Sequence, residues 1–223
     1  MSGWVRRWRV DPAAVSRLAV RPDTGGLVLG VDPVGSPVHL PAPAGQARTV
    51  VCIGGLQLGR HLAFRALGAG ARVAVASGRA GQWSTLQGRV GGRAALPVQP
   101  LGDFDLRGAG PARPVVAVLD AGARPARPGR LPAWTLLVVL LPFLDPDAVP
   151  LVTAADAVVA ARTSPDEAAA LGQALGLDRS TSSLVPGLPD DRVLLVGRRV
   201  VPVDVAPTWL EAEVLGPLTR LDG

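Results

Sequence analysis

Lysine and tyrosine do not occur in this 223-residue sequence, and cysteine and histidine are scarce. Cys52 is the only cysteine, so the chain cannot form an intramolecular disulfide, which fits a reducing compartment. His39 and His61 are the only histidines, and two histidines with one cysteine are too few for a usual zinc site. The lack of tyrosine and lysine excludes the Tyr–Lys chemistry of short-chain dehydrogenases. We therefore predict no catalytic residues and no metal centre built from these side chains.

Long hydrophobic runs are absent as well. The most apolar stretch is residues 134–141 (WTLLVVLL), which is bounded by Pro132 and Pro142. It is far shorter than the roughly 20 residues with which a helix crosses a bilayer, so it predicts a buried central strand. The charged N-terminus also lacks the long apolar region of a cleavable signal peptide. We therefore expect neither a transmembrane helix nor a signal peptide.

Positive charge is concentrated at the N-terminus. The formal net charge is +5, and residues 1–21 hold five arginines against one aspartate, so the remainder is nearly neutral. A nucleic-acid-binding protein usually spreads a basic stripe, interleaved with aromatic residues, over its folded surface. We therefore expect no nucleic-acid partner. The sequence divides into a basic Trp/Arg-rich segment, residues 1–24, and a single α/β domain, residues 25–223.

Residues 49–76 (TVVCIGGLQLGRHLAFRALGAGARVAVA) predict a strand, a glycine turn, a helix and a second strand. Such a turn places backbone N–H groups at a helix N-terminus, where Rossmann and P-loop proteins bind phosphate. Gly54 and Gly59 match the first and third glycines of the dinucleotide fingerprint G-x-G-x-x-G, but Leu56 replaces the second. The turn therefore has the glycines of a phosphate site without the complete motif.

The charged groups around this turn also depart from the known motifs. A P-loop requires lysine and a hydroxyl residue where this chain has Arg60 and His61. The second strand ends without a carboxylate for a ribose hydroxyl, although Arg79 is placed to face a 2′-phosphate. If a cofactor binds, the predicted residues are Gly54, Gly55, Gly59 and Arg79. Otherwise these glycines serve only the turn and the packing of the helix on the strand.

Asp103 and Asp105 form a D-x-D pattern, with which many nucleotide-sugar glycosyltransferases hold a divalent metal. A second copy lies at Asp145 and Asp147. Two-residue patterns arise easily, and aspartate is common in loops because it caps backbone N–H groups. We therefore treat Asp103 and Asp105 as weak metal candidates and predict no metal site.

Turn and capping signals define the remaining elements. Residues 27–40 predict a β-hairpin around an Asp-Pro-Val-Gly turn, and residues 192–205 predict a second hairpin. Capping boxes begin helices at Ser164 and Thr208. Strands that alternate with helices between two hairpins predict a three-layer α/β domain. Its mixed sheet would be Rossmann-like or glycosyltransferase-like, with an N-terminal β-hairpin and a C-terminal hairpin plus helix.

The order of these motifs resembles the cytosolic domain of EccE, a core component of actinobacterial type VII (ESX) secretion systems. In that family a hairpin with G-x-D-x-x-G-x-P/A-V precedes a strand, a helix, the motif G-A-R-V-x-V and a tryptophan. Residues 26–40, residues 49–79 and Trp83 follow this order. The S-P-x-E-A-A helix at residues 164–169 and the Ala-Pro-Thr helix start at residues 206–208 agree with the C-terminal half.

The resemblance implies an α/β domain without established catalysis that serves a type VII secretion complex. We therefore expect a non-catalytic scaffold that binds no cofactor. Its partners would be other membrane components of the complex, and it would lie in the cytoplasm, peripheral to the inner membrane. EccE normally begins with transmembrane helices, and this sequence shows none, so we expect a soluble relative or a truncated form.

Two enzyme functions remain as alternatives, both of them nucleotide-binding. An NADP-dependent oxidoreductase would bind its cofactor at Gly54, Gly59 and Arg79. A nucleotide-sugar transferase would bind its donor through a metal near Asp103 and Asp105. Neither function has a recognisable acid–base partner in the sequence.

The N-terminal segment has two interpretations: a basic tail, loosely ordered or packed on the domain, which we favour, and a segment that adsorbs weakly to an anionic membrane. On a helix, the spacing of Trp4 and Trp8 would place both indoles on one face, and arginine beside tryptophan suits the headgroup layer. We expect binding to anionic liposomes to fall when both tryptophans are replaced and Arg6, Arg7 and Arg9 are neutralised. A cosedimentation assay measures this, and unchanged binding would remove the membrane contact.

Overall fold

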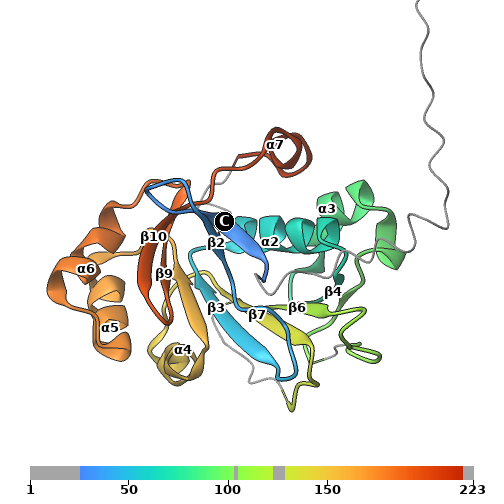
Figure 1. Cartoon of the computed structure of the whole chain (residues 1–223), viewed down its shortest axis with the longest axis horizontal. Helices are drawn as coiled ribbons and strands as arrows, with labels where there is room; N and C mark the ends of the chain where they lie inside the picture. The colour runs from blue at the N-terminus through green and yellow to red at the C-terminus, as the bar shows by residue number, and fades with distance from the viewer. Residues whose placement is uncertain (1–25, 103–104, 123–128, 218–223) are drawn as a thin grey trace, which may run out of the picture.

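One mixed sheet of ten strands forms the centre of the protein, in the order β2-β1-β10-β9-β8-β3-β7-β6-β4-β5 (Figure 1). The computed structural model describes residues 26–102, 105–122 and 129–217. Neighbouring strands run parallel from β8 to β5, while β9, β10, β1 and β2 extend the sheet antiparallel. The strands are β1 (Val28–Val31), β2 (Pro37–His39), β3 (Arg48–Ile53), β4 (Arg72–Ser77), β5 (Val98–Gln99), β6 (Val115–Asp120), β7 (Thr135–Leu141), β8 (Ala157–Ala160), β9 (Arg192–Val196) and β10 (Val200–Asp204).

The central strands are apolar because both of their faces are covered. All residues of β6 and β7 are buried, as are the last four of β3. Alternate residues enter two separate cores, with Val50 and Cys52 in one and Val51 and Ile53 in the other. The predicted central strand at residues 134–141 is β7, which lies between β3 and β6.

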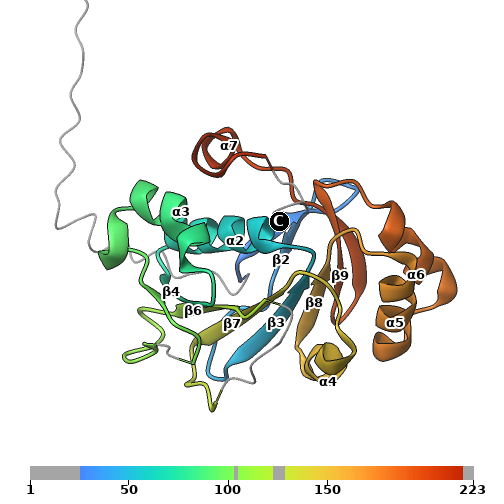
Figure 2. The same cartoon turned by 180° about the vertical axis from the view of Figure 1, so that it is seen from behind.

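Helices cover both faces of the sheet. The first core contains side chains of α2, α3 and α7, and the second contains side chains of α4 and α5. Figures 1 and 2 show α2, α3 and α7 together on one side of the sheet, with α4 on the other. The α/β fold with a mixed sheet is therefore confirmed. The helices are α2 (Leu56–Gly68), α3 (Ser84–Arg89), α4 (Val149–Ala154), α5 (Pro165–Leu175), α6 (Arg179–Leu184) and α7 (Trp209–Leu215), with short 3₁₀ turns η1 (Ala80–Trp83), η2 (Gly92–Ala94), η3 (Pro146–Ala148) and η4 (Val185–Gly187).

Local signals predicted most of the element boundaries. Both capping boxes are present, with Ser164 and Glu167 at α5 and Thr208 and Glu211 at α7. The N-terminal hairpin turns at Asp32, whose carbonyl accepts a 2.9 Å hydrogen bond from the Gly35 N–H. The C-terminal hairpin is β9 and β10.

The N-terminal segment lies outside the described residues, and with it the predicted contact residues Trp4, Arg6, Arg7, Trp8 and Arg9. In the part of the chain that the structure describes, no helix combines the length and the apolar character needed to span a membrane.

A buried ion pair fixes α7 on α2. Arg65 Nε donates to Glu211 Oε1 at 2.5 Å, Nη2 donates to Oε2 at 3.1 Å, and Nη1 donates to the Leu29 carbonyl at 2.5 Å. The Glu211 side chain is 3% exposed and that of Arg65 15%. Burial raises the pKa of Glu211, but hydrogen bonds from Arg65 and Thr208 outweigh it, so this pKa lies below its ordinary value of 4.5. The pair therefore links α2, β1 and α7.

Replacement of Glu211 is expected to destabilise the protein in a pH-dependent way. Glu211→Gln should lower the free energy of unfolding at pH 7 by about 3 kcal/mol, because it leaves Arg65 buried without a counter-charge. A carboxylate with a lowered pKa stabilises the fold above its unfolded pKa, and this contribution is lost as pH falls through the folded pKa. When the pH is lowered from 7 to below about 4.5, the free energy of unfolding should therefore fall less in the variant than in the wild type.

Urea denaturation between pH 3 and pH 7 measures both effects. The matched control is Glu213→Gln, which removes the same charge from an exposed position on the same helix. Equal losses in the two variants would contradict a stabilising role for the buried pair.

Candidate functional site

The carboxyl ends of the parallel strands form a topological switch point. After β3 the chain passes through α2 on one face of the sheet, and after β7 it passes through α4 on the opposite face. Because β3 and β7 are neighbours, their two connections diverge, and α/β domains bind ligands in the crevice that this divergence creates. This edge carries the glycine turn after β3 and the ends of β4 and β6.

The glycine turn is required by close packing. Gly54 and Gly55 have φ angles of +119° and +126°, which side-chain-bearing residues rarely adopt. A Cβ atom on Gly54 would lie 2.4 Å from the Cβ of Ala161, just beyond β8. The Gly54 N–H also donates to the Leu141 carbonyl at 3.0 Å. The turn thus holds the ends of β3, β7 and β8 together.

Helix α2 begins directly after this turn, at Leu56, so the residues that form the loop of a P-loop are helical here. Gly59 lies inside the helix, where a Cβ atom would be 2.3 Å from Leu140 Cδ1. Gly59 therefore permits close packing of the helix on the sheet, which is the role of the third fingerprint glycine. No acidic residue occurs in the first turn of α2, and its N-cap Gly55 provides no side-chain cap.

Arg60 and His61 stand where a P-loop has its lysine and its hydroxyl. Arg60 Nη1 donates to Gln57 Oε1 at 3.0 Å, and Nη2 donates to the carbonyl and side-chain oxygens of Gln82. The guanidinium group therefore lies between α2 and η1. His61 is buried, its Nδ1 lies 2.9 Å from the Gln57 carbonyl, and its burial lowers its pKa.

Asp120, at the end of β6, is the charged residue that our sequence analysis missed. It is fully buried and accepts hydrogen bonds from Ser77 Oγ at 2.8 Å and Trp83 Nε1 at 3.0 Å. Arg79 Nε donates a hydrogen bond to Asp120 Oδ1 at 3.0 Å, and Arg79 Nη2 lies 2.9 Å from the same oxygen. The available signal was an aspartate at the end of a wholly apolar strand, VVAVLD. Arg79, a predicted cofactor residue, therefore contacts Asp120.

The other candidate side chains lie apart from this edge or are engaged locally. Asp105 is bound by Arg107 at 3.0 Å, and this hydrogen bond lowers its pKa, while Arg72 lies 3.8 Å away. Asp103 lies outside the described residues. Asp145 is the N-cap of η3 and accepts a hydrogen bond from the Asp147 N–H. Cys52 lies in β3, where burial raises the pKa of its thiol to about 12. Within the described ranges, no group of three or more His, Cys, Asp or Glu residues is placed to hold a metal ion.

The α/β fold with its ten-stranded mixed sheet resembles that of a solved structure. Its parallel strands lie in the order β8-β3-β7-β6-β4-β5. The structure of VirB4 from Thermoanaerobacter pseudethanolicus has a TM-score of 0.55 at 10% sequence identity, over 85% of this chain and 98% of that one. B204, the DNA-packaging ATPase from Sulfolobus Turreted Icosahedral Virus, has a TM-score of 0.47 at 13% identity, over 71% and 98% of the two chains. No family model matches the sequence, and no curated protein is significantly similar to it.

These findings correct three predictions. The identification with EccE is wrong, because the structural likeness is to VirB4. The expected non-catalytic scaffold function in type VII secretion is wrong, and so is the expectation that the chain is not an enzyme. The motifs that suggested EccE are a hairpin turn, packing glycines and capping boxes, which serve local structure in many α/β domains. The nucleotide-binding alternative is better supported.

Loss of Arg79 is expected to destabilise the carboxyl edge. Arg79→Ala should lower the free energy of unfolding by about 3 kcal/mol, because Asp120 would stay buried without its counter-charge. Chemical denaturation at pH 7 measures the loss. In a double-mutant cycle with Asp120→Asn, the combined loss should be smaller than the sum of the two single losses. Strict additivity would show that the two side chains are not coupled.

Proposed function

We propose that the chain is a nucleotide-binding, ATPase-like domain whose site is the carboxyl edge at Gly54 and Gly55. The observation that carries the proposal is the combination at this edge of a glycine turn at a helix N-terminus and a buried aspartate on a nearby strand, within a RecA-like fold. In P-loop NTPases the backbone of such a turn binds the β- and γ-phosphates, and a Walker-B aspartate holds Mg²⁺.

The helix and the turn favour a phosphate. The 13 residues of α2 direct the positive end of the helix dipole at the turn, and its first turn contains no carboxylate that would repel an anion. Gly55 is half-buried, has a positive φ and carries no side chain beside its backbone N–H, whereas the Gly54 N–H already donates to the Leu141 carbonyl. The helix dipole and the Gly55 N–H therefore supply part of what a phosphate site requires.

Two arginines supply cationic groups near the turn. Arg60 belongs to the second turn of α2, and Arg79 follows β4. Arginine binds phosphate through two parallel N–H donors, so it can replace a P-loop lysine as the source of charge. Both guanidinium groups are hydrogen-bonded to protein oxygens, so phosphate would compete with these contacts. We therefore expect weaker nucleotide binding than in a P-loop protein.

Asp120 fits the role of the metal carboxylate. Mg²⁺ is usually bound by one or two carboxylates together with substrate phosphates, so a cluster of acidic side chains is not required. The P-loop hydroxyl has no counterpart, because His61 occupies that position and its Nδ1 contacts the carbonyl of its own helix. When bound, Mg²⁺ would neutralise phosphate charge, and Arg79 would be released from Asp120 to face the phosphates.

ATP binding with and without Mg²⁺ tests the proposal. We expect the wild type to bind ATP more tightly with Mg²⁺ than with EDTA, as measured by isothermal titration calorimetry. Asp120→Asn should remove this difference, because the neutral amide is a poorer metal ligand. Arg60→Ala should weaken binding about tenfold, the equivalent of one lost charged contact. Mg²⁺-dependent phosphate release from ATP should likewise be lost in Asp120→Asn.

The matched control is Arg89→Ala, which removes one positive charge from an exposed position on α3. Its affinity for ATP should equal that of the wild type. A folded wild type that binds neither ATP nor GTP at millimolar concentration would overturn the proposal. Thermal stabilisation by NADP or a nucleotide sugar, but not by ATP, would contradict the ATPase assignment.

A further inference from the structure

A cavity lies at the opposite edge of the sheet, at the amino ends of the parallel strands. It has a volume of about 380 Å³. Arg48 begins β3 and Asp156 directly precedes β8, while the antiparallel β9 and β10 bring their connecting turn, residues 197–199, to the same place. Because β3 and β8 are parallel, this edge is a strand length away from the glycine turn.

The floor of this cavity is apolar. Leu40, Ala157 and Leu195 are buried and contribute to its lining. Leu40 belongs to the segment that connects β2 to β3, and the other two residues belong to neighbouring strands. The volume lies within the range of small-molecule sites, which combine mainly apolar walls with a few placed polar groups.

One acidic side chain lines the cavity, and its charge is already satisfied. Asp156 Oδ1 accepts a hydrogen bond from Arg48 Nη1 at 2.7 Å, and Oδ2 accepts one from the Thr49 N–H at 2.8 Å. This carboxylate therefore ties the beginning of β3 to β8. It is not available to neutralise a further cation at the cavity.

Two other arginines at the cavity have no counter-charge. Arg198 and Arg199, in the turn between β9 and β10, form no ion pair or side-chain hydrogen bond with the described residues. The half-buried ring of His39 lines the same cavity. The cavity therefore combines an apolar floor with two exposed guanidinium groups that have no acidic partner among the described residues.

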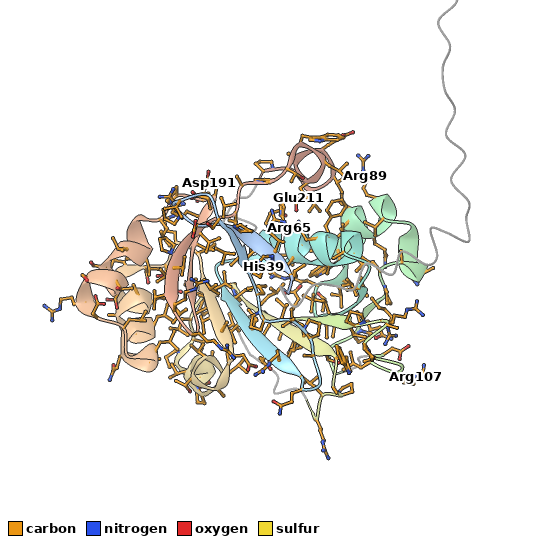
Figure 3. The ribbon with its side chains drawn as sticks, in the orientation of Figure 1. His39, Arg65, Arg89, Arg107, Asp191 and Glu211 are labelled. Carbon is orange, nitrogen blue, oxygen red and sulfur yellow. The ribbon has the colours of Figure 1, made fainter. Side chains whose placement is uncertain are left out.

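We propose that this cavity binds a small organic phosphate. The phosphate would pair with Arg198 and Arg199, whose guanidinium groups offer the paired donors that phosphate oxygens accept. An apolar or aromatic part of the same molecule would cover Leu40, Ala157 and Leu195. His39 ends the edge strand β2, and Figure 3 shows Arg89 well apart from it on α3.

Three probes separate the contributions of charge and apolar surface. Phenyl phosphate carries both groups, inorganic phosphate carries only the anion, and phenol carries only the ring. We expect wild-type protein to bind phenyl phosphate at least tenfold more tightly than either of the other two, as measured by calorimetry. Equal affinity for phenyl phosphate and inorganic phosphate would overturn the role of the apolar floor, and failure to bind phenyl phosphate would overturn the proposal.

Arginine variants locate the site. Arg198→Ala/Arg199→Ala should weaken phenyl phosphate binding at least tenfold, and its circular dichroism spectrum should match that of the wild type because both side chains are exposed. The control Arg89→Ala/Arg93→Ala removes the same charge from exposed positions at α3 and η2 and should leave binding unchanged. If both double variants bind phenyl phosphate equally weakly, the loss of affinity would be explained by the lower net charge alone, and the proposal would be overturned.

The same titration distinguishes this site from the proposed nucleotide site. Arg60→Ala should not change the affinity for phenyl phosphate, and Arg198→Ala/Arg199→Ala should not change the Mg²⁺ dependence of ATP binding. Phenyl phosphate binding that depends on Arg60 and not on the turn arginines would place it at the glycine turn and overturn the second site. Failure of ATP binding alone would leave the second site unaffected.

Discussion

The close approach of α2 to the sheet is the constraint on which the carboxyl edge depends. At Gly54 the turn meets Ala161, and at Gly59 the helix meets Leu140, so closely that neither position has room for a Cβ atom. This packing places the helix N-terminus directly above the junction of β3, β7 and β8. Residues 56–59 belong to this helix, so the edge differs in form from a P-loop.

Electrostatic balance at this edge follows from that geometry. Asp120 is buried and paired with the partly exposed Arg79, while Arg60 lies between Gln57 and Gln82. Each of these charged groups therefore has a partner within the protein. These contacts stabilise the fold, and the phosphates of a nucleotide would have to compete with them for the guanidinium groups. At the other end of α2, the Arg65–Glu211 pair holds α7 in place. Gln57 also donates to the Leu215 carbonyl at 2.5 Å, so α7 is linked to the first turn of α2 as well.

The two edges of the sheet differ in how their charges are satisfied. At the carboxyl edge every acidic and basic side chain described above has a partner of opposite charge or a polar contact. At the amino edge, Arg48 and Asp156 neutralise each other, and Arg198 and Arg199 do not have such a partner among the described residues. Unbalanced charge beside an apolar cavity suggests a ligand more directly than the paired charge does. The two sites that we propose therefore rest on different grounds, the nucleotide site on topology and the organic-phosphate site on unpaired charge.

The sequence by itself determined the local elements. Short-range chemistry specifies them: Asp32 and Gly35 close a turn, Ser164 and Thr208 cap helices, and the run before Pro142 is too apolar to be exposed. Only the tertiary structure decided the strand order and the pairing of Arg79 with Asp120, residues 41 positions apart. Such contacts depend on which strands become neighbours, and no pattern of a few residues encodes that choice. The mistaken resemblance to EccE has the same origin, because turns, caps and packing glycines report local structure and many folds share them.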